Sequence, residues 1–134
     1  MANEAVIVDI LGQPTGEPIR YKIADSIAVP KGSLMVFSGA LARQVKVGDT
    51  PGQIFAGIAA TEKVANDGST TLGCWTKGVF DIKCDTALAI GDQVVMSGAN
   101  ACSGAGTKYG LAFGKAIEVG AAVADVNMIA VGVL

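Results

Sequence analysis

The chain contains no histidine and only three cysteines, Cys74, Cys84 and Cys102, none of which has a CxxC spacing. Without histidine it lacks the usual general base near neutral pH and the Cys/His sets that hold zinc. A nucleophilic Cys84 or Cys102 would also lack its usual histidine partner. The odd cysteine count gives no complete disulfide framework, so we expect buried thiols in a reducing compartment. These absences predict a protein that is not an enzyme and has no metal or other cofactor.

Charge is scarce as well. Charged residues make up 16% of the 134-residue chain, whereas 51% is hydrophobic and 5% is aromatic. A typical soluble domain has about 25% charged residues, so we expect apolar surface patches of the kind that form interfaces. The net charge of −2, without a basic run, predicts no nucleic-acid partner. No apolar run has the about 18 residues of a membrane helix, and residues 1–5 do not resemble a signal peptide. We therefore expect a soluble protein made in the cytoplasm, without a membrane partner.

Short strands dominate the pattern. The 18 glycines suit tight turns, and Ile19, Tyr21 and Ile23 alternate with polar residues, as in a half-buried strand. Strands are predicted over residues 19–23, 33–38, 54–60, 70–76, 79–84, 93–97, 111–117 and 126–133, with a hairpin turn at Lys77-Gly78. Residues 40–46 and 116–125 are too short and too weakly capped to predict helices. The fold is therefore predicted to be all-β, a compact β-sandwich or barrel.

An internal repeat organises the body of the chain. One pair of segments aligns without a gap at an offset of 59 (87 − 28) and shares six residues; a second pair aligns at an offset of 57 and matches Gly57 with Gly114. The aligned pairs are 28–40 with 87–99 and 55–60 with 112–117. Duplicated units that bury their apolar faces against each other explain such a pattern. We predict pseudo-repeats at about 24–82 and 83–134, within a β-rich domain of residues 19–134.

The N-terminal segment has a different character. An apolar stretch from Glu4 to Leu11 is followed by glycines and prolines at positions 12, 14, 16 and 18. This punctuation prevents a regular element and predicts an extended arm over residues 1–18. Such an arm either packs along its own domain or reaches onto a neighbour.

Three further segments suggest chemistry only weakly. Lys63, within residues 60–65, resembles the hairpin lysine of lipoyl or biotinyl carrier domains, but Val64 matches them poorly and carrier domains are shorter. We interpret Lys63 as a solvated loop charge. Residues 66–70 have some character of a calcium loop but fit a polar hairpin tip better. Residues 98–106 lack the spacing of a phosphate loop and are interpreted as a flexible surface loop.

A set of segments along nearly the whole chain points to one known family. They are 52–71, 76–82, 89–94 and 114–120, together with the opening apolar segment and the strand at residues 19–21. In these segments the chain resembles tailed-bacteriophage capsid cement proteins, also called head decoration proteins. The resemblance implies a virion protein that binds the outer surface of an expanded icosahedral head. It also implies a homotrimer, with the major capsid protein as partner, that clamps neighbouring capsid subunits and has no catalytic residues.

The arm is the hypothetical capsid contact, through strand addition near residues 5–10. The residues assigned to it are Ala2, Asn3, Glu4, Ala5, Val6, Ile7, Val8, Asp9 and Ile10. The alternatives are a lipoyl- or biotinyl-like carrier modified at Lys63, and a trimeric receptor-binding knob.

Overall fold

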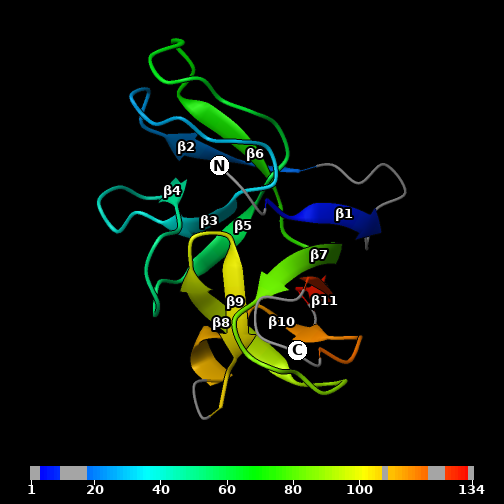
Figure 1. Ribbon diagram of the computed structural model, residues 1–134. Helices are drawn as coiled ribbons and strands as arrows, with labels where there is room; N and C mark the ends of the chain where they lie inside the picture. Colours follow the sequence, from blue (N-terminus) through cyan, green and yellow to red (C-terminus); the bar gives the residue numbers. More distant parts are fainter. Residues whose placement is uncertain (1–3, 10–17, 107–108, 121–125, 133–134) are drawn as a thin grey trace.

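The fold is all-β, as the sequence predicts, and it consists of two closed barrels rather than a sandwich. The computed structural model describes residues 4–9, 18–106, 109–120 and 126–132 (Figure 1). Apart from one short 3-10 helix, η1 (Tyr109–Leu111), every regular element in these ranges is a strand or an isolated bridge. Residues 19–75 form barrel 1, in the upper half of Figure 1, and residues 78–131 form barrel 2 below it.

The two barrels have the same topology. Barrel 1 closes in the order β2-β4-β3-β5-β6, and its strands are β2 (Ile19–Ile23), β3 (Leu34–Phe37), β4 (Gln44–Val47), β5 (Phe55–Ala59) and β6 (Thr71–Trp75). Barrel 2 closes in the order β7-β9-β8-β10-β11, and its strands are β7 (Gly78–Cys84), β8 (Gln93–Gly98), β9 (Ala101–Gly104), β10 (Gly114–Ala116) and β11 (Val126–Val131). The parallel pairs are β2 with β4 in barrel 1 and β7 with β9 in barrel 2. All other neighbouring strands pair antiparallel.

The predicted repeat is confirmed down to single hydrogen bonds, but the predicted bounds differ from the barrels, because they leave out β2 and divide β7 between the two units. In barrel 1 the Gly32 amide donates to the carbonyl oxygen of Ala59 at 2.9 Å, and in barrel 2 the Gly91 amide donates to that of Ala116 at 2.8 Å. The two donors, Gly32 and Gly91, differ by the offset of 59, and the two acceptors, Ala59 and Ala116, differ by the offset of 57. The bridge between Val29 and Lys63 likewise recurs between Leu88 and Gly120.

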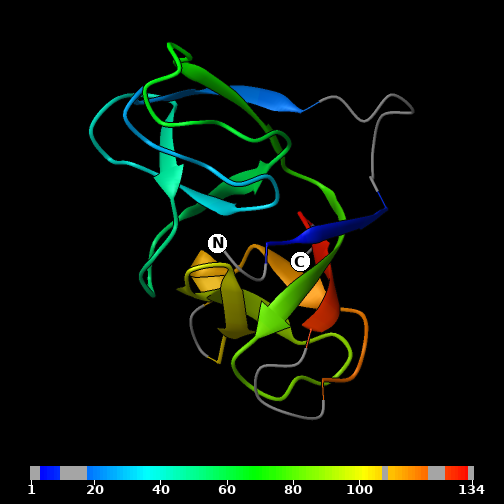
Figure 2. The same ribbon diagram turned by 45° about the horizontal axis from the view of Figure 1, so that its top comes forward.

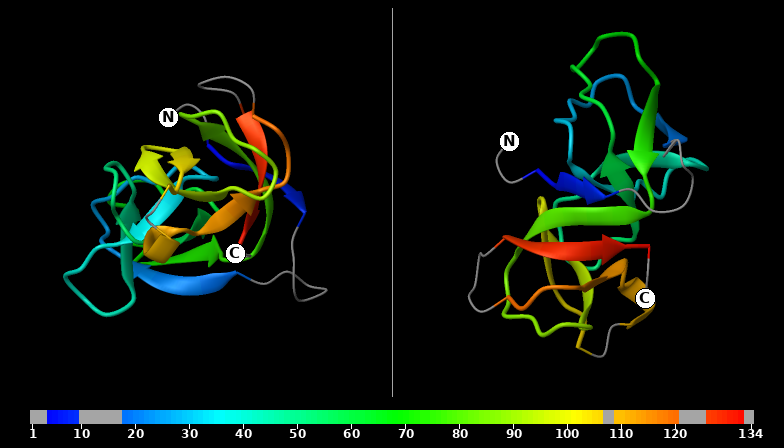
Figure 3. Two further views of the ribbon diagram at one scale, coloured as in Figure 1. Left: turned by 90° about the horizontal axis from the view of Figure 1, so that it is seen from below. Right: turned by 90° about the vertical axis from the view of Figure 1, so that its right-hand side faces the viewer.

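The barrels share a hydrophobic core. Leu34, Val36 and Ile58 of barrel 1 belong to the same buried cluster as the interior of barrel 2, whereas Met35 faces the separate interior of barrel 1. Strand β3 is therefore buried on both faces, which explains its unbroken apolar run. The amide of Leu34 also donates to the buried Oδ1 of Asn100 at 3.1 Å. The barrels thus share one core, and the turned views in Figures 2 and 3 show them side by side.

The apolar surplus of the sequence divides between this shared core and the surface. The exposed large apolar side chains in the described ranges are Val6, Ile19, Phe37, Leu41, Ile54, Val64, Ile90, Ile117, Val119 and Val126. From the composition we predicted only apolar surface patches. The sequence alone did not show that two small barrels would also bury apolar side chains against each other.

Four local predictions are wrong. Residues 40–46 and 98–106 were not assigned strands, yet they contribute to β4 and β9, and the second is not a flexible loop. Lys77-Gly78 is not a hairpin turn, because β6 and β7, both fully described, belong to different barrels. The predicted strand over 111–117 is shortened to β10, because the chain first forms η1.

Candidate functional site

The N-terminal arm contributes a strand to the sheet of barrel 2, so the prediction that it forms no regular element is wrong. Strand β1 (Val6–Asp9) pairs antiparallel with β7, with Val6 opposite Asp81 and Asp9 opposite Val79. It is the end strand of the six-stranded sheet, and the right-hand view of Figure 3 shows β1, β7 and β11 in that order. The structure pairs no strand with the other edge of β1 in the described ranges. This edge is a place where an extended segment of a partner can add.

Gly32 holds the start of the arm against barrel 1. The amide of Ala5 donates to the carbonyl oxygen of Gly32 at 2.7 Å, and Ala5 is buried. Gly32 has a φ of +87°, and a Cβ there would overlap the carbonyl oxygen of Ala5. The equivalent Gly91 of barrel 2 has a φ of +92°, but its Cβ would meet open space. Position 32 therefore needs glycine for two reasons, and position 91 for one.

A groove lies beside the arm, between it and barrel 1. Its volume is about 400 Å³, and its lining residues are Glu4, Ala5, Val6, Lys31, Gly32, Ile58 and Ala59. Val6 is 59% exposed, so apolar surface remains available on β1. Apart from Glu4 and Lys31, which carry opposite charges, the lining is uncharged. Such a groove suits a segment with small apolar side chains better than a charged small molecule.

Barrel 1 does not offer the same acceptor edge. Aligning the two parallel strand pairs matches Asp81 with Arg20 and Val79 with Pro18. Pro18 has no amide hydrogen to donate, and the guanidinium Nη2 of Arg43 donates to the carbonyl oxygen of Arg20 at 2.9 Å. Both groups block the site where a strand equivalent to β1 would pair. Of the two equivalent strands β2 and β7, both described, only β7 therefore offers the arm a docking edge.

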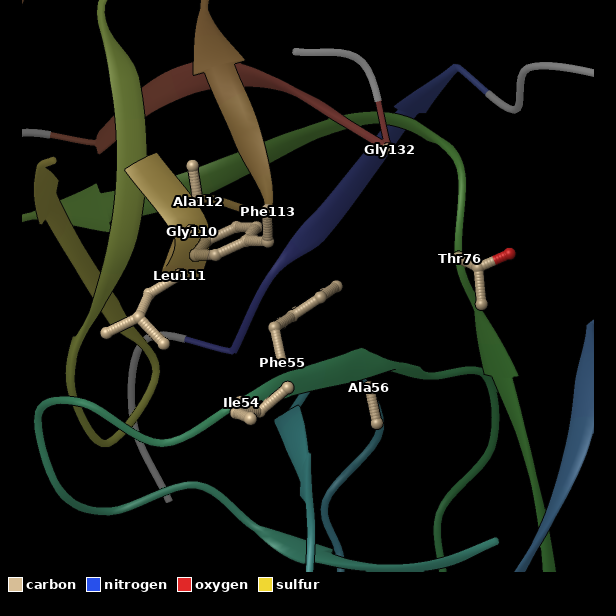
Figure 4. A pocket seen from close by; sticks show the side chains of 9 residues that line it. All are labelled: Ile54, Phe55, Ala56, Thr76, Gly110, Leu111, Ala112, Phe113 and Gly132. Atoms are coloured by element: carbon tan, nitrogen blue, oxygen red, sulfur yellow. The ribbon is translucent and has the colours of Figure 1, made fainter. Parts of the chain in front are cut away.

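A second cavity, of about 290 Å³, lies between the barrels (Figure 4). Within its lining the rings of Phe55 and Phe113 stack, with their centroids 4.3 Å apart and their planes at 19°. The other lining residues are Ile54, Ala56, Thr76, Gly110, Leu111, Ala112 and Gly132. The described lining has no titratable side chain, so it provides no ordinary general acid or base, and its one hydroxyl group is that of Thr76.

Lys63 is buried, so its interpretation as a solvated loop charge is wrong. Its side chain is 2% exposed, and Nζ lies 3.0 Å from Asp67 Oδ1 and 3.5 Å from Asp25 Oδ1. Nζ also donates to the carbonyl oxygens of Asp25, at 2.8 Å, and Val64, at 3.2 Å. Hydrogen bonds, chiefly from the Ser69 amide and then from Lys63, lower the pKa of Asp67.

This arrangement does not favour the two chemical interpretations of the loop. A carrier lysine must be exposed to be modified, whereas this ammonium is enclosed by oxygen acceptors. The ammonium of Lys63 also lies between the carboxylates of Asp25 and Asp67, where a bound cation would sit. The loop over residues 66–70 therefore fits the predicted polar hairpin tip better than a calcium site. No cluster of three or more acidic or cysteine side chains suited to a metal is present in the described parts of the chain.

The three cysteines are buried thiols. Burial raises the pKa of Cys74 to about 12. Cys84 and Cys102 lie opposite each other in the parallel pair of β7 and β9, with their Sγ atoms 3.3 Å apart. The hydrogen bond to Cys84, followed by burial, raises the pKa of Cys102. A high thiol pKa keeps the thiolate population low at neutral pH, which is unfavourable for a nucleophile.

The predicted arm residues are only partly described. Glu4 and Ala5 precede β1, and Val6, Ile7, Val8 and Asp9 form it, whereas Ala2, Asn3 and Ile10 lie outside the described residues. The sequence analysis did not assign roles to Gly32 and β7, which receive the arm. The repeat was the available signal, since it marked Gly32 and Gly91 as equivalent turn residues.

A comparison of the chain with models of known protein families gives no match, and a comparison with curated proteins gives none either. No candidate for a membrane-spanning helix is found within the described ranges. The resemblance to capsid cement proteins therefore remains an expectation from the sequence.

Proposed function

We propose that this protein is a non-catalytic structural protein of a phage virion, which binds the outer surface of the expanded head and clamps neighbouring major capsid subunits. The observation that carries this proposal is the position of β1 as the end strand of a sheet, beside a mainly uncharged groove. An extended capsid segment gains main-chain hydrogen bonds along such an edge, and the groove receives its side chains.

The shared core supports a clamping role. Because Leu34, Val36 and Ile58 pack into the core of barrel 2, the two barrels resist separation when the protein bridges two subunits. A clamp whose halves moved independently would transmit little of its binding energy to the shell.

Self-association into a trimer is part of the same proposal. Ile90, Ile117 and Val119 are exposed, and the bond between the Gly91 amide and Ala116 brings the first two to one end of barrel 2. Apolar residues gathered in this way are suited to contacts between copies. Three linked copies then bind a symmetric shell with avidity greater than the affinity of one.

The test is co-sedimentation of the purified protein with expanded and unexpanded heads that lack it. Gly32→Ala and Gly91→Ala form a matched pair, because both strain a φ near +90° but only the first displaces Ala5. We expect Gly32→Ala to bind expanded heads about tenfold more weakly than Gly91→Ala, which corresponds to about 1.4 kcal/mol.

Equal binding by the two variants would show that the docked arm is not the contact. A wild-type protein that fails to bind expanded heads would overturn the proposed function itself. Light scattering on the bound and free protein would test the trimer, whose mass is three times 13.5 kDa.

A further inference from the structure

Cys84 and Cys102 have the placement of a pair that can be joined. They are direct partners in the parallel ladder between β7 and β9, and neighbouring strands lie about 4.8 Å apart. Disulfides span Cα distances of about 4.4–6.8 Å. The Sγ atoms already lie 3.3 Å apart, so small side-chain rotations bring them to the bond length of about 2.05 Å.

The repeat shows that closing a barrel of this kind does not require thiols. The equivalent partners in barrel 1 are Ile23 and Val45, which pair in the same parallel register. Both are buried in the core of their barrel. Aliphatic side chains therefore serve at this position in one barrel, whereas the other barrel has two facing thiols.

We propose that Cys84 and Cys102 are an oxidisable pair that forms a disulfide and so closes barrel 2 covalently. Each thiol loses its proton, one S–S bond forms, and two electrons pass to a two-electron oxidant. Diamide takes up the two electrons and two protons at its azo bond and becomes a hydrazine, and hydrogen peroxide becomes two waters. Cys74 belongs to the core cluster of barrel 1 and has no part in this step.

The expected time of oxidation rests on the proposed function. A virion protein is made in a reducing cytoplasm and acts on a particle that is later released into an oxidising medium. Both thiols are fully buried, and burial together with their hydrogen bond disfavours the thiolate that attacks an oxidant. Oxidation is therefore slow during assembly and proceeds over the longer life of the free particle.

The bond would constrain the unfolded chain between two residues that are 18 positions apart. A loop of about that length is expected to raise Tm by roughly 10 °C in a domain of this size. Because β7 also carries the arm, the same bond holds the acceptor strand of β1 in place.

The experiment uses the purified native protein without capsids, so its outcome does not depend on the proposed function. The protein is incubated with diamide at pH 8.5 or with a thiol reductant, then denatured and titrated for thiols. We expect three thiols in the reduced sample and one in the oxidised sample. Intact mass should fall by two hydrogens, and peptide mapping should link residue 84 to residue 102.

Two variants sharpen the result. Cys74→Ala should still form the bond, whereas Cys102→Val, which copies the residue of barrel 1, should lose both the bond and the Tm increase. Three remaining thiols after prolonged oxidation of the native protein would overturn the proposal, as would a disulfide that includes Cys74. The mapping on the unaltered chain remains decisive even where a variant folds poorly.

Discussion

Replacing Phe113 by alanine tests whether the barrels fold as one unit. Phe113 is 5% exposed and stacks on Phe55 across the interface. Removing a buried phenylalanine usually costs about 3–5 kcal/mol, of which about 0.5–1.5 kcal/mol belongs to an aromatic pair. Because the inter-barrel cavity already lies beside the ring, water can fill the vacated space, and we expect a loss of about 3 kcal/mol.

Urea unfolding measures this loss with two probes. Trp75, the single tryptophan, packs against the shared core and reports it by fluorescence, while circular dichroism reports all strands. Phe37→Ala is the control, because Phe37 is 42% exposed, and it should cost less than about 1.5 kcal/mol. The double variant with Phe55→Ala should show a coupling of about 0.5–1.5 kcal/mol. The shared core would be refuted if Phe113→Ala and Phe37→Ala lowered the free energy of unfolding equally. Two separate unfolding transitions in the wild-type protein would refute it as well.

Three further predictions concern titratable groups. Lys63→Ala should lower the free energy of unfolding by about 1–3 kcal/mol, since it removes charged hydrogen bonds; an unchanged urea midpoint would contradict the ion cluster. The pKa of Asp67 is lowered from 3.8 in the folded protein. Its stabilising contribution is therefore present above about pH 4 and is lost as pH falls through the pKa of the folded state. Thermal melts from pH 6 to 2 should be less pH-dependent in Asp67→Asn than in the wild type. Because the pKa of Cys74 rises from 9.0 to about 12, stability is full below pH 9 and falls between these values; a Cys74→Val protein with the same alkaline slope would disprove this assignment.

The repeat was the most informative feature of the sequence. Its two offsets, 59 and 57, correspond to matching hydrogen bonds around Gly32 and Gly91. The predicted strand over residues 79–84 matches β7, whose buried residues include Phe80 and Ile82. Hydrophobic pattern could show that an element repeats, but not that the two copies close separately and then pack together, because those contacts link residues far apart in the chain.

Two strands of the barrels escaped prediction, and they are equivalent members of the repeat. β4 begins just after Arg43 and β9 just after Asn100, and both of these residues have a positive φ, of 58° and 53°. Each strand has only four residues, and each follows small or polar residues that are typical of loops. Tertiary pairing with β2 or β7, rather than local propensity, determines these strands.

The candidate site could be predicted only in part. The arm was recognisable from its prolines and glycines, but its partner strand was not, since pairing with β7 joins residues at least seventy positions apart. Lys63 was misjudged because no local pattern reveals that Asp25 and Asp67 meet around it.

The asymmetry at Pro18 and Arg43 also limits how copies of the protein can combine. A chain with one arm and two equivalent acceptor edges could link three copies at a single molecule, and arm exchange would then build branched networks. Since the Arg20 edge is blocked, a copy that exchanged its arm could receive only one arm in return, on β7. Exchange between copies is restricted to one for one, which allows closed rings and linear chains but no branching.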